Sequence, residues 1–340
     1  MAARFRAKPD VAGNHLMLFR LFRLAGNRLR SAAATTQSCT AQTRRTMSID
    51  NLTIIGERIN PGFRRSKELL DNKDLDGIRD MAVMQAEKGA DYLTINVGDA
   101  STDDPDFLVD LIHTVQDAVS IPLSFDYPGK DVQTLCLSTY DDAKADGKKP
   151  IVNSISELRL DMLELIGERP FRMILMVSER SDGDDRLPNR TAEDVHQTAR
   201  RLTELVLAQN GGMTADDIFV DVSIGPMASD SEGVIKQAIE SIRLIGSDPD
   251  LKGVHPVVGL SNLSIMLPGR AIDGSLLKVQ LESAFLTMAM PLGLDTILGT
   301  AGRDYQILPE DNFIYQGFKD TLECTGFDAL TELMKLYREE

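Results

Sequence analysis

The chain has 340 residues, 42% of them hydrophobic and 26% charged, which is the balance of a globular protein and excludes a wholly disordered or collagen-like chain. Its formal net charge of -15 argues against nucleic acid as a partner, because phosphate contacts require clustered lysine and arginine. Three cysteines without close spacing exclude a disulfide framework and a cysteine-rich zinc site, and the absence of a long apolar run predicts no membrane span.

Residues 1–46 form a basic N-terminal extension. They carry nine lysines and arginines against one aspartate, so the rest of the chain has a net charge of -23. This composition, with a Ser/Thr/Ala/Gln tract at its end, is typical of an organelle transit peptide. A dispensable extension explains it equally well, and we favour that interpretation together with a cytoplasmic location. We expect residues 1–46 to be disordered or dispensable, so that a protein starting at Met47 folds and functions.

Eight short apolar runs follow, and each is predicted to be a buried parallel strand because both of its faces are apolar. They span residues 52–56, 92–97, 122–125, 150–153, 173–177, 218–222, 254–260 and 296–299. Amphipathic segments between them predict helices at residues 75–88, 104–119, 192–209, 231–245 and 276–290. Asp74 and Thr191 stand where two of these helices need an N-cap.

Eight alternating units in one α/β chain favour a closed (β/α)8 TIM barrel over residues 47–306. The alternative, an open doubly wound sheet, usually has a glycine-rich phosphate turn after its first strand, whereas residues 56–62 read G-E-R-I-N-P-G. Residues 307–340 contain two further helical patterns, at 311–323 and 328–338. We expect this C-terminal helical extension to pack on the barrel or on a second subunit.

Catalytic residues of such barrels lie at the carboxyl ends of the strands. The first polar residues there are, in chain order, Glu57, Asn96, Asp126, Asn153, Ser178 with Glu179, Asp221, Ser261 with Asn262, and Thr300. Histidine, lysine and cysteine are missing from this set, which argues against a phosphate site and predicts no metal site.

A barrel mouth of carboxylates and amides suits a neutral heterocycle with many N–H donors, such as the 2-amino-4-oxopyrimidine ring of a pterin or guanine. Recognition of this kind is selective, because a mismatched ligand leaves buried polar groups unpaired. The alternative is that these side chains only cap the following helices or turns. That alternative accounts for one or two of them more easily than for five or six.

At the same residues the sequence resembles the pterin-binding methyltransferases, which move a methyl group between tetrahydrofolate and a corrinoid protein. This family is related to the folate module of cobalamin-dependent methionine synthase and to dihydropteroate synthase. The resemblance runs from about residue 52 to 300 and is carried, in order, by I-G-E-R-I-N-P at 55–61, I-N-V-G at 95–98, I-V-N-S at 151–154, F-V-D at 219–221 and G-L-S-N at 259–262.

The resemblance implies a role for each matching residue. Asp126, Asn153 and Asp221 would hold the pterin ring, and Asn262 would be the catalytic residue near N5, the atom that carries the methyl group. The remaining substrate-binding residues implied at the mouth are Glu57, Asn96, Ser261 and Arg270. Tetrahydrofolate or 5-methyltetrahydrofolate would be the substrate, a partner protein would supply the corrinoid (cobalamin), and a homodimer is expected.

Two positions depart from the family pattern. Thr94 stands where many relatives have aspartate, and Ile265 stands where some have glutamine. They keep open a non-catalytic, regulatory pterin-binding protein. A dihydropteroate synthase-like enzyme is the other alternative, but it needs a phosphate-handling lysine and arginine near the last strands, which here end in Ser-Asn and Gly-Thr.

Overall fold

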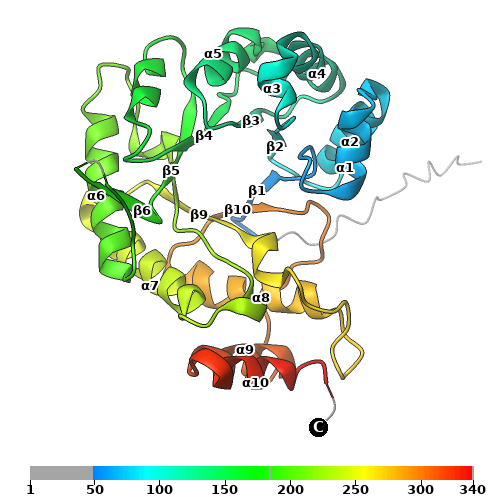
Figure 1. Ribbon diagram of the computed structural model, residues 1–340, viewed down its shortest axis with the longest axis vertical. Coiled ribbons are helices and arrows are strands. Elements are labelled where there is room, and N and C mark those ends of the chain that lie inside the picture. Colours follow the sequence, from blue (N-terminus) through cyan, green and yellow to red (C-terminus); the bar gives the residue numbers. More distant parts are fainter. Residues whose placement is uncertain (1–48, 184, 339–340) are drawn as a thin grey trace, which may run out of the picture. The chain divides into compact units, whose positions relative to one another are not determined.

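The computed structural model describes residues 49–183 and 185–338. Its barrel strands are β1 (Thr53–Gly56), β2 (Tyr92–Ile95), β3 (Leu123–Asp126), β4 (Ile151–Ile155), β5 (Arg172–Met176), β8 (Ile218–Asp221), β9 (His255–Gly259) and β10 (Thr296–Gly299). They form a closed parallel barrel in the order β1-β10-β9-β8-β5-β4-β3-β2 (Figure 1). The predicted (β/α)8 barrel is confirmed, and every strand end lies within two residues of its predicted position.

The side chains of each strand alternate between the inside of the barrel and the surrounding helices. Six inward residues form a small apolar cluster of their own: Ile55, Tyr92, Ile151, Ile174, Phe219 and Val257. The outward residues join the larger core beneath the helices. The middle of the barrel is therefore filled, and ligands can enter only above or below this layer.

Helices surround the strands (Figure 1). They are α1 (Arg64–Asp71), α2 (Leu75–Glu87), α3 (Ala100–Asp103), α4 (Pro105–Ala118), α5 (Lys130–Thr139), α6 (Ala192–Leu207), α7 (Val234–Ser247) and α8 (Leu277–Ala289). Both predicted caps are confirmed: Asp74 Oδ1 accepts from the Gly77 N–H at 2.9 Å, and Thr191 Oγ1 accepts from the Asp194 N–H at 3.1 Å. None of the helices among the described residues is long and apolar enough to cross a membrane.

The connection between β4 and β5 departs from the regular repeat. It contains a 3-10 helix, Leu160–Leu165, in place of an α-helix. Directly after β5, an antiparallel hairpin of β6 (Glu179–Asp182) and β7 (Asp185–Pro188) was not predicted. Both irregularities lie between β4 and α6, so the barrel mouth is asymmetric around its rim.

The C-terminal extension forms α9 (Phe313–Leu322) and α10 (Gly326–Met334). Figure 1 shows the two helices together below α8; α9 packs against α8, and α10 packs against α9, with Phe318 and Leu333 buried. The Ile272 N–H donates to the Leu336 carbonyl at 2.9 Å, which connects this extension to the loop between β9 and α8. Packing on a second subunit stays a prediction, and residues 1–46 lie outside the described part of the chain.

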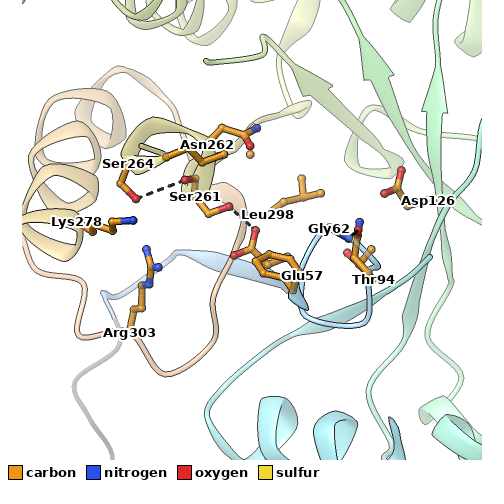
Figure 2. Close-up of a pocket in the computed structure, with 14 residues that line it drawn as sticks. Glu57, Gly62, Thr94, Asp126, Ser261, Asn262, Ser264, Lys278, Leu298 and Arg303 are labelled. Atoms are coloured by element: carbon orange, nitrogen blue, oxygen red, sulfur yellow. Dashed lines mark hydrogen bonds between the residues drawn. The ribbon is translucent and has the colours of Figure 1, made fainter. Parts of the chain in front are cut away.

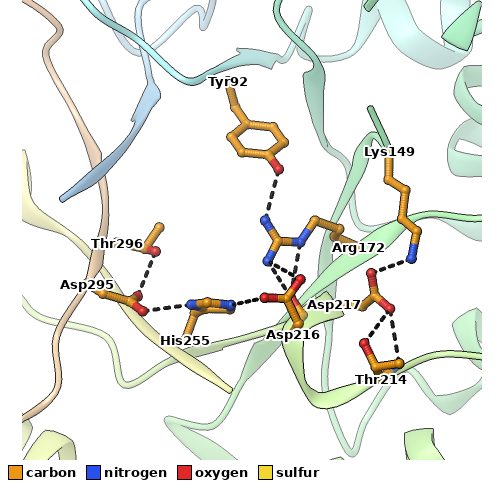
Figure 3. A network of polar contacts seen from close by, with 9 residues as sticks. All are labelled: Tyr92, Lys149, Arg172, Thr214, Asp216, Asp217, His255, Asp295 and Thr296. Atoms are coloured by element: carbon orange, nitrogen blue, oxygen red, sulfur yellow. Dashed lines mark hydrogen bonds and ion pairs between the residues drawn. The ribbon is translucent and has the colours of Figure 1, made fainter. Parts of the chain in front are cut away.

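A polar network closes the barrel at the amino ends of its strands (Figure 3). Arg172 Nη1 donates to the Tyr92 hydroxyl at 2.9 Å, and the guanidinium lies 4.4 Å from the centre of the Phe219 ring. His255 lies between two carboxylates, with Nδ1 2.7 Å from Asp295 Oδ2 and Nε2 3.3 Å from Asp216 Oδ1. The amino end is thus closed by ion pairs, which leaves the carboxyl end as the open side.

Candidate functional site

A cavity of about 560 Å³ lies at the carboxyl ends of the strands (Figure 2). It is lined by Glu57, Asn60, Gly62, Phe63, Thr94, Asp126, Gly259, Ser261, Asn262, Ser264, Ile265, Lys278, Leu298 and Arg303. Four predicted site residues are among these: Glu57, Asp126, Ser261 and Asn262. Three others stand at the strand ends around the cavity without lining it: Asn96, Asn153 and Asp221. The volume falls in the range of small-molecule sites.

Asp126 and Asp221 are the last residues of β3 and β8, and each carboxylate is only partly satisfied. Asp126 Oδ2 accepts from Asn96 Nδ2 at 3.1 Å, and Asp221 Oδ1 accepts from the Ser223 N–H at 2.8 Å. Within the described residues, the second oxygen of each carboxylate receives no hydrogen bond. Two half-satisfied acceptors therefore stand at the mouth.

The electrostatics of this pair reflect burial. Burial raises the pKa of Asp126, with the hydrogen bond from Asn96 and the charge of Arg159 opposing it. Burial also raises the pKa of Asp221 to about 6; the Ser223 hydrogen bond opposes this, while the nearby Asp126 charge adds to it. Each ionised carboxylate has only one hydrogen-bond donor, so a ligand that brings further N–H groups would lower the free energy of the site.

Asn96 and Asn153 extend this polar surface along the neighbouring strands. Asn96 bridges two elements, since its Oδ1 accepts from the Gly98 N–H at 2.8 Å while its amide donates to Asp126. Asn153 pairs in register with Asp126 across β3 and β4. Its backbone carbonyl is fixed by Gln133 Nε2 at 3.1 Å, while its side-chain amide has no hydrogen bond to any described residue. The amide is free to bind a ligand.

The capping alternative can be checked against these contacts. The N-cap of α5 is Gly129, and that of α7 is Gly233, so neither Asp126 nor Asp221 caps the helix that follows it. Asn96 and Asp221 do accept from a backbone N–H two residues ahead, as side chains in turns commonly do. Local turns thus occupy one oxygen of Asn96 and one of Asp221. They do not account for Asp126, which makes no such contact.

Glu57 differs from the two aspartates, because both of its carboxylate oxygens already accept hydrogen bonds from the protein. It is 8% exposed, and both of its oxygens are occupied: Thr300 Oγ1 donates to Oε1 and Ser261 Oγ donates to Oε2, each at 2.7 Å. These contacts connect the end of β1 to the segments after β9 and β10. Glu57 therefore holds the segments that follow β9 and β10 in place, and the main role of Ser261 is its hydrogen bond to Glu57.

Asn262 lies on a 3-10 turn, Leu260–Ser264, directly after β9. Its side chain folds over Gly259, where an added Cβ would come within 2.8 Å of Asn262 Nδ2, so a larger residue at position 259 would displace the amide. Asn262 is exposed, and its side-chain amide makes no hydrogen bond within residues 49–183 and 185–338. An amide held above the cavity in this way can donate to or accept from a bound ligand.

The turn that carries Asn262 is held in place by hydrogen bonds and an ion pair to α8 and to the segment after β10. Ser264 Oγ donates to Glu282 Oε1 at 2.6 Å, and Glu282, which is fully buried on α8, is ion-paired with Arg303. Burial raises the pKa of Glu282, while the hydrogen bond and charge of Arg303 oppose that shift. These contacts join the turn, α8 and the segment after β10, and so limit the freedom of Asn262.

Arg270 does not line the cavity either, and it lies in the loop between β9 and α8 instead of at a strand end. Its side chain is exposed, and Nη1 donates to the Gly274 carbonyl at 2.7 Å within the same loop. The sequence analysis in turn missed Lys278 and Arg303, which line the cavity. Arg303 follows the last strand closely and was open to detection there, whereas Lys278 lies on a helix and gave no such signal.

The chain is similar to pterin-binding enzymes and to a methyltransferase. Residues 59–298 match the family model described as "Pterin binding enzyme". A methylcorrinoid:tetrahydrofolate methyltransferase from Eubacterium limosum is 28% identical over 264 residues, which cover 74% of this chain and 86% of that protein.

Solved structures of dihydropteroate synthases share the fold. The enzyme from Xanthomonas albilineans with 4-aminobenzoic acid has a TM-score of 0.53 at 16% identity, covering 76% of this chain and 91% of that one. The enzyme from Thermus thermophilus in complex with 6HMPPP has a TM-score of 0.51 at 14% identity, covering 76% and 92%. Such low identities establish a common barrel and say nothing of the reaction.

Proposed function

We propose that this chain, which belongs to the pterin-binding enzyme family, is a methyltransferase that moves a methyl group between N5 of tetrahydrofolate and the cobalt of a corrinoid protein. The observation that carries the proposal is the pair of half-satisfied carboxylates, Asp126 and Asp221, beside a free amide at the same mouth. The name of the Eubacterium limosum relative supports the same reaction.

Pterin recognition follows from the hydrogen-bonding capacity of these groups. The pyrimidine edge of a pterin offers ring and exocyclic N–H donors, and the free oxygens of Asp126 and Asp221 are acceptors. The Asn153 amide both donates and accepts, which suits the adjacent oxo and ring-nitrogen atoms. Ligands without those donors would leave partly buried carboxylates unpaired and would bind far less tightly.

The transfer step requires control of the proton on N5. When N5 of tetrahydrofolate attacks the methyl carbon, the carbon–cobalt bond breaks, its electron pair stays on cobalt, and N5 releases a proton. In the reverse direction cob(I)alamin attacks the methyl group and N5 takes up a proton as its bond breaks. The Asn262 amide would orient the N5 lone pair in one direction and stabilise the developing N5–H in the other.

Positioning would then supply most of the rate enhancement, because the Asn262 amide is itself neither a strong acid nor a strong base. The corrinoid would arrive on a partner protein; the name of the Eubacterium limosum relative states a methylcorrinoid as its methyl carrier. Within the described residues, no group of three or more histidine, cysteine and carboxylate side chains could hold a metal ion.

The dihydropteroate synthase alternative keeps one specific observation in its favour. Lys278 and Arg303 line the cavity near the last strands, where such an enzyme needs cations for a diphosphate. Arg303 is ion-paired with the buried Glu282, however, so its charge is already balanced. Of these two cations only Lys278 remains to balance a diphosphate, so the synthase is the weaker alternative.

The test is an anaerobic assay that supplies tetrahydrofolate with free methylcobalamin as the methyl donor. We expect 5-methyltetrahydrofolate to form as the cobalt spectrum changes to that of cob(I)alamin. Tetrahydrofolate binding without transfer, also when a methylated corrinoid protein replaces free methylcobalamin, would instead indicate a regulatory pterin-binding protein. Formation of dihydropteroate from a pterin diphosphate and 4-aminobenzoate would indicate the synthase.

A further inference from the structure

We propose that Lys278 forms an anion subsite in the cavity that binds the carboxylates of a pteroylglutamate tail. This inference rests on the proposed function, whose substrate, tetrahydrofolate, carries such a tail, and it assigns one residue of the cavity to that tail. The residue is absent from the set of strand-end residues that sequence motifs identify, because it lies on α8.

The cavity has two chemically different sides. Figure 2 shows Asp126 on one side and Lys278 with Arg303 on the other, with Glu57 between them. One side thus accepts hydrogen bonds and the other carries positive charge. A ligand that matches both has N–H donors at one end and an anionic group at the other.

The two cations differ in how their charge is balanced. Arg303 makes hydrogen bonds to both oxygens of the fully buried Glu282. For Lys278, no carboxylate among the described residues lies within ion-pair distance, although 23 such pairs form elsewhere in that part of the chain. Lys278 is therefore the cation whose charge is left for a ligand.

The position of Lys278 on its helix is unfavourable without a ligand. It is the second residue of α8, whose first turn contains no acidic residue and whose N-cap, Leu276, makes no side-chain capping bond. A lysine there adds to the positive end of the helix dipole and destabilises the helix. A bound carboxylate would compensate both the lysine and the uncapped helix end.

The size of the cavity supports a ligand larger than a bicyclic ring. Its volume of about 560 Å³ is that of a site for a drug-sized molecule. Lys278 is partly exposed, as expected for contact with a flexible, hydrated tail and not with the buried ring. A benzoylglutamate substituent at the pterin ring meets both conditions.

The experiment compares the binding of tetrahydrofolate with that of 6-methyltetrahydropterin, which lacks the tail, by anaerobic calorimetry. In Lys278→Gln we expect about five- to tenfold weaker tetrahydrofolate binding and unchanged 6-methyltetrahydropterin binding, the usual size of a charge-assisted contact. Lys252→Gln is the matched control, because Lys252 is an exposed lysine in the turn before β9, at the opposite end of the barrel.

Each other outcome has a distinct meaning. Tetrahydrofolate binding by Lys278→Gln at wild-type strength would overturn the subsite. If Lys278→Gln lost more affinity for a pterin diphosphate than for tetrahydrofolate, the ligand group bound by Lys278 would be a phosphate, and the carboxylate assignment would be wrong. A wild-type protein that binds neither tetrahydrofolate nor 6-methyltetrahydropterin would overturn the proposed function itself.

Discussion

The side chains of Asn262 and Asp221 differ in the hydrogen bonds they leave open, and this difference suits one to the reacting atom and the other to substrate binding. Asp221 is held by one local hydrogen bond and keeps one oxygen open, which suits ground-state binding of a ring edge. Asn262 lies on a braced turn and has a free amide, which suits contact with the reacting atom. Loss of Asp221 should therefore mainly weaken substrate binding, whereas loss of Asn262 should mainly lower kcat.

We expect Asn262→Ala to lower kcat for methyl transfer by about 10²- to 10³-fold, the usual effect of removing one preorganised hydrogen-bonding group at a reacting atom. The dissociation constant for tetrahydrofolate should change by less than about threefold. Single-turnover transfer measured beside calorimetric binding separates the two effects. An equal loss in both would assign Asn262 to substrate binding instead.

From the sequence, four of the residues that line the cavity could be identified, namely Glu57, Asp126, Ser261 and Asn262, because they stand at or just after strand ends, which the barrel brings together. The family resemblance also placed Arg270 at the mouth, whereas its side chain donates to the Gly274 carbonyl within its own loop. The sequence analysis missed Lys278 and Glu282, because helix residues reach the cavity or its supports only through tertiary packing.

At the scale of elements, the strands were predicted well and some connections were not. Apolar runs determine the buried strands almost alone, whereas α1 has the polar sequence R-R-S-K-E-L-L-D with only Ser66 and Leu70 buried. Helix α5 is short, and the β6–β7 hairpin consists mainly of charged residues. Such elements are stabilised by contacts with the barrel that local patterns do not reveal.

The closure of the barrel at its amino end depends on His255 and can be tested through pH. Its hydrogen bond to Asp295 is the main cause that raises the pKa of His255. A group whose pKa is raised on folding contributes stability fully below its unfolded pKa, about 6.5, and loses it as pH rises through the folded pKa. The contact should therefore stabilise β9 against β10 mainly in mildly acidic solution.

We expect Asp295→Asn to lower the free energy of unfolding by about 0.5–1 kcal/mol at pH 6 and by much less at pH 9. Urea titrations followed by circular dichroism at both pH values measure the difference. The surface substitution Asp311→Asn is the control, with the same small effect expected at each pH. A loss that is equal at pH 6 and pH 9 would show that the ionised pair is not its cause.

At the scale of the whole molecule, the barrel separates stability from recognition. Its amino end is closed by the network around Arg172 and His255, its middle is an apolar layer, and its carboxyl end holds the polar cavity. The dihydropteroate synthases share this architecture, so the barrel alone does not distinguish between the two reactions. At the carboxyl end, the barrel combines two half-satisfied aspartates with a lysine that has no ion-pair partner among the described residues.

The account depends most on the claim that Asp126 and Asp221 bind the pyrimidine edge of a reduced pterin. The direct measurement is an anaerobic calorimetric titration with tetrahydrofolate of the wild type, Asp126→Asn and Asp221→Asn between pH 5 and 8. We predict at least tenfold weaker binding by each variant at pH 7. Wild-type affinity should fall below pH 6, as protonation of Asp221, whose pKa is about 6, removes an acceptor, and Asp221→Asn should lack this decline. Wild-type affinity in both variants would contradict the assignment of the site.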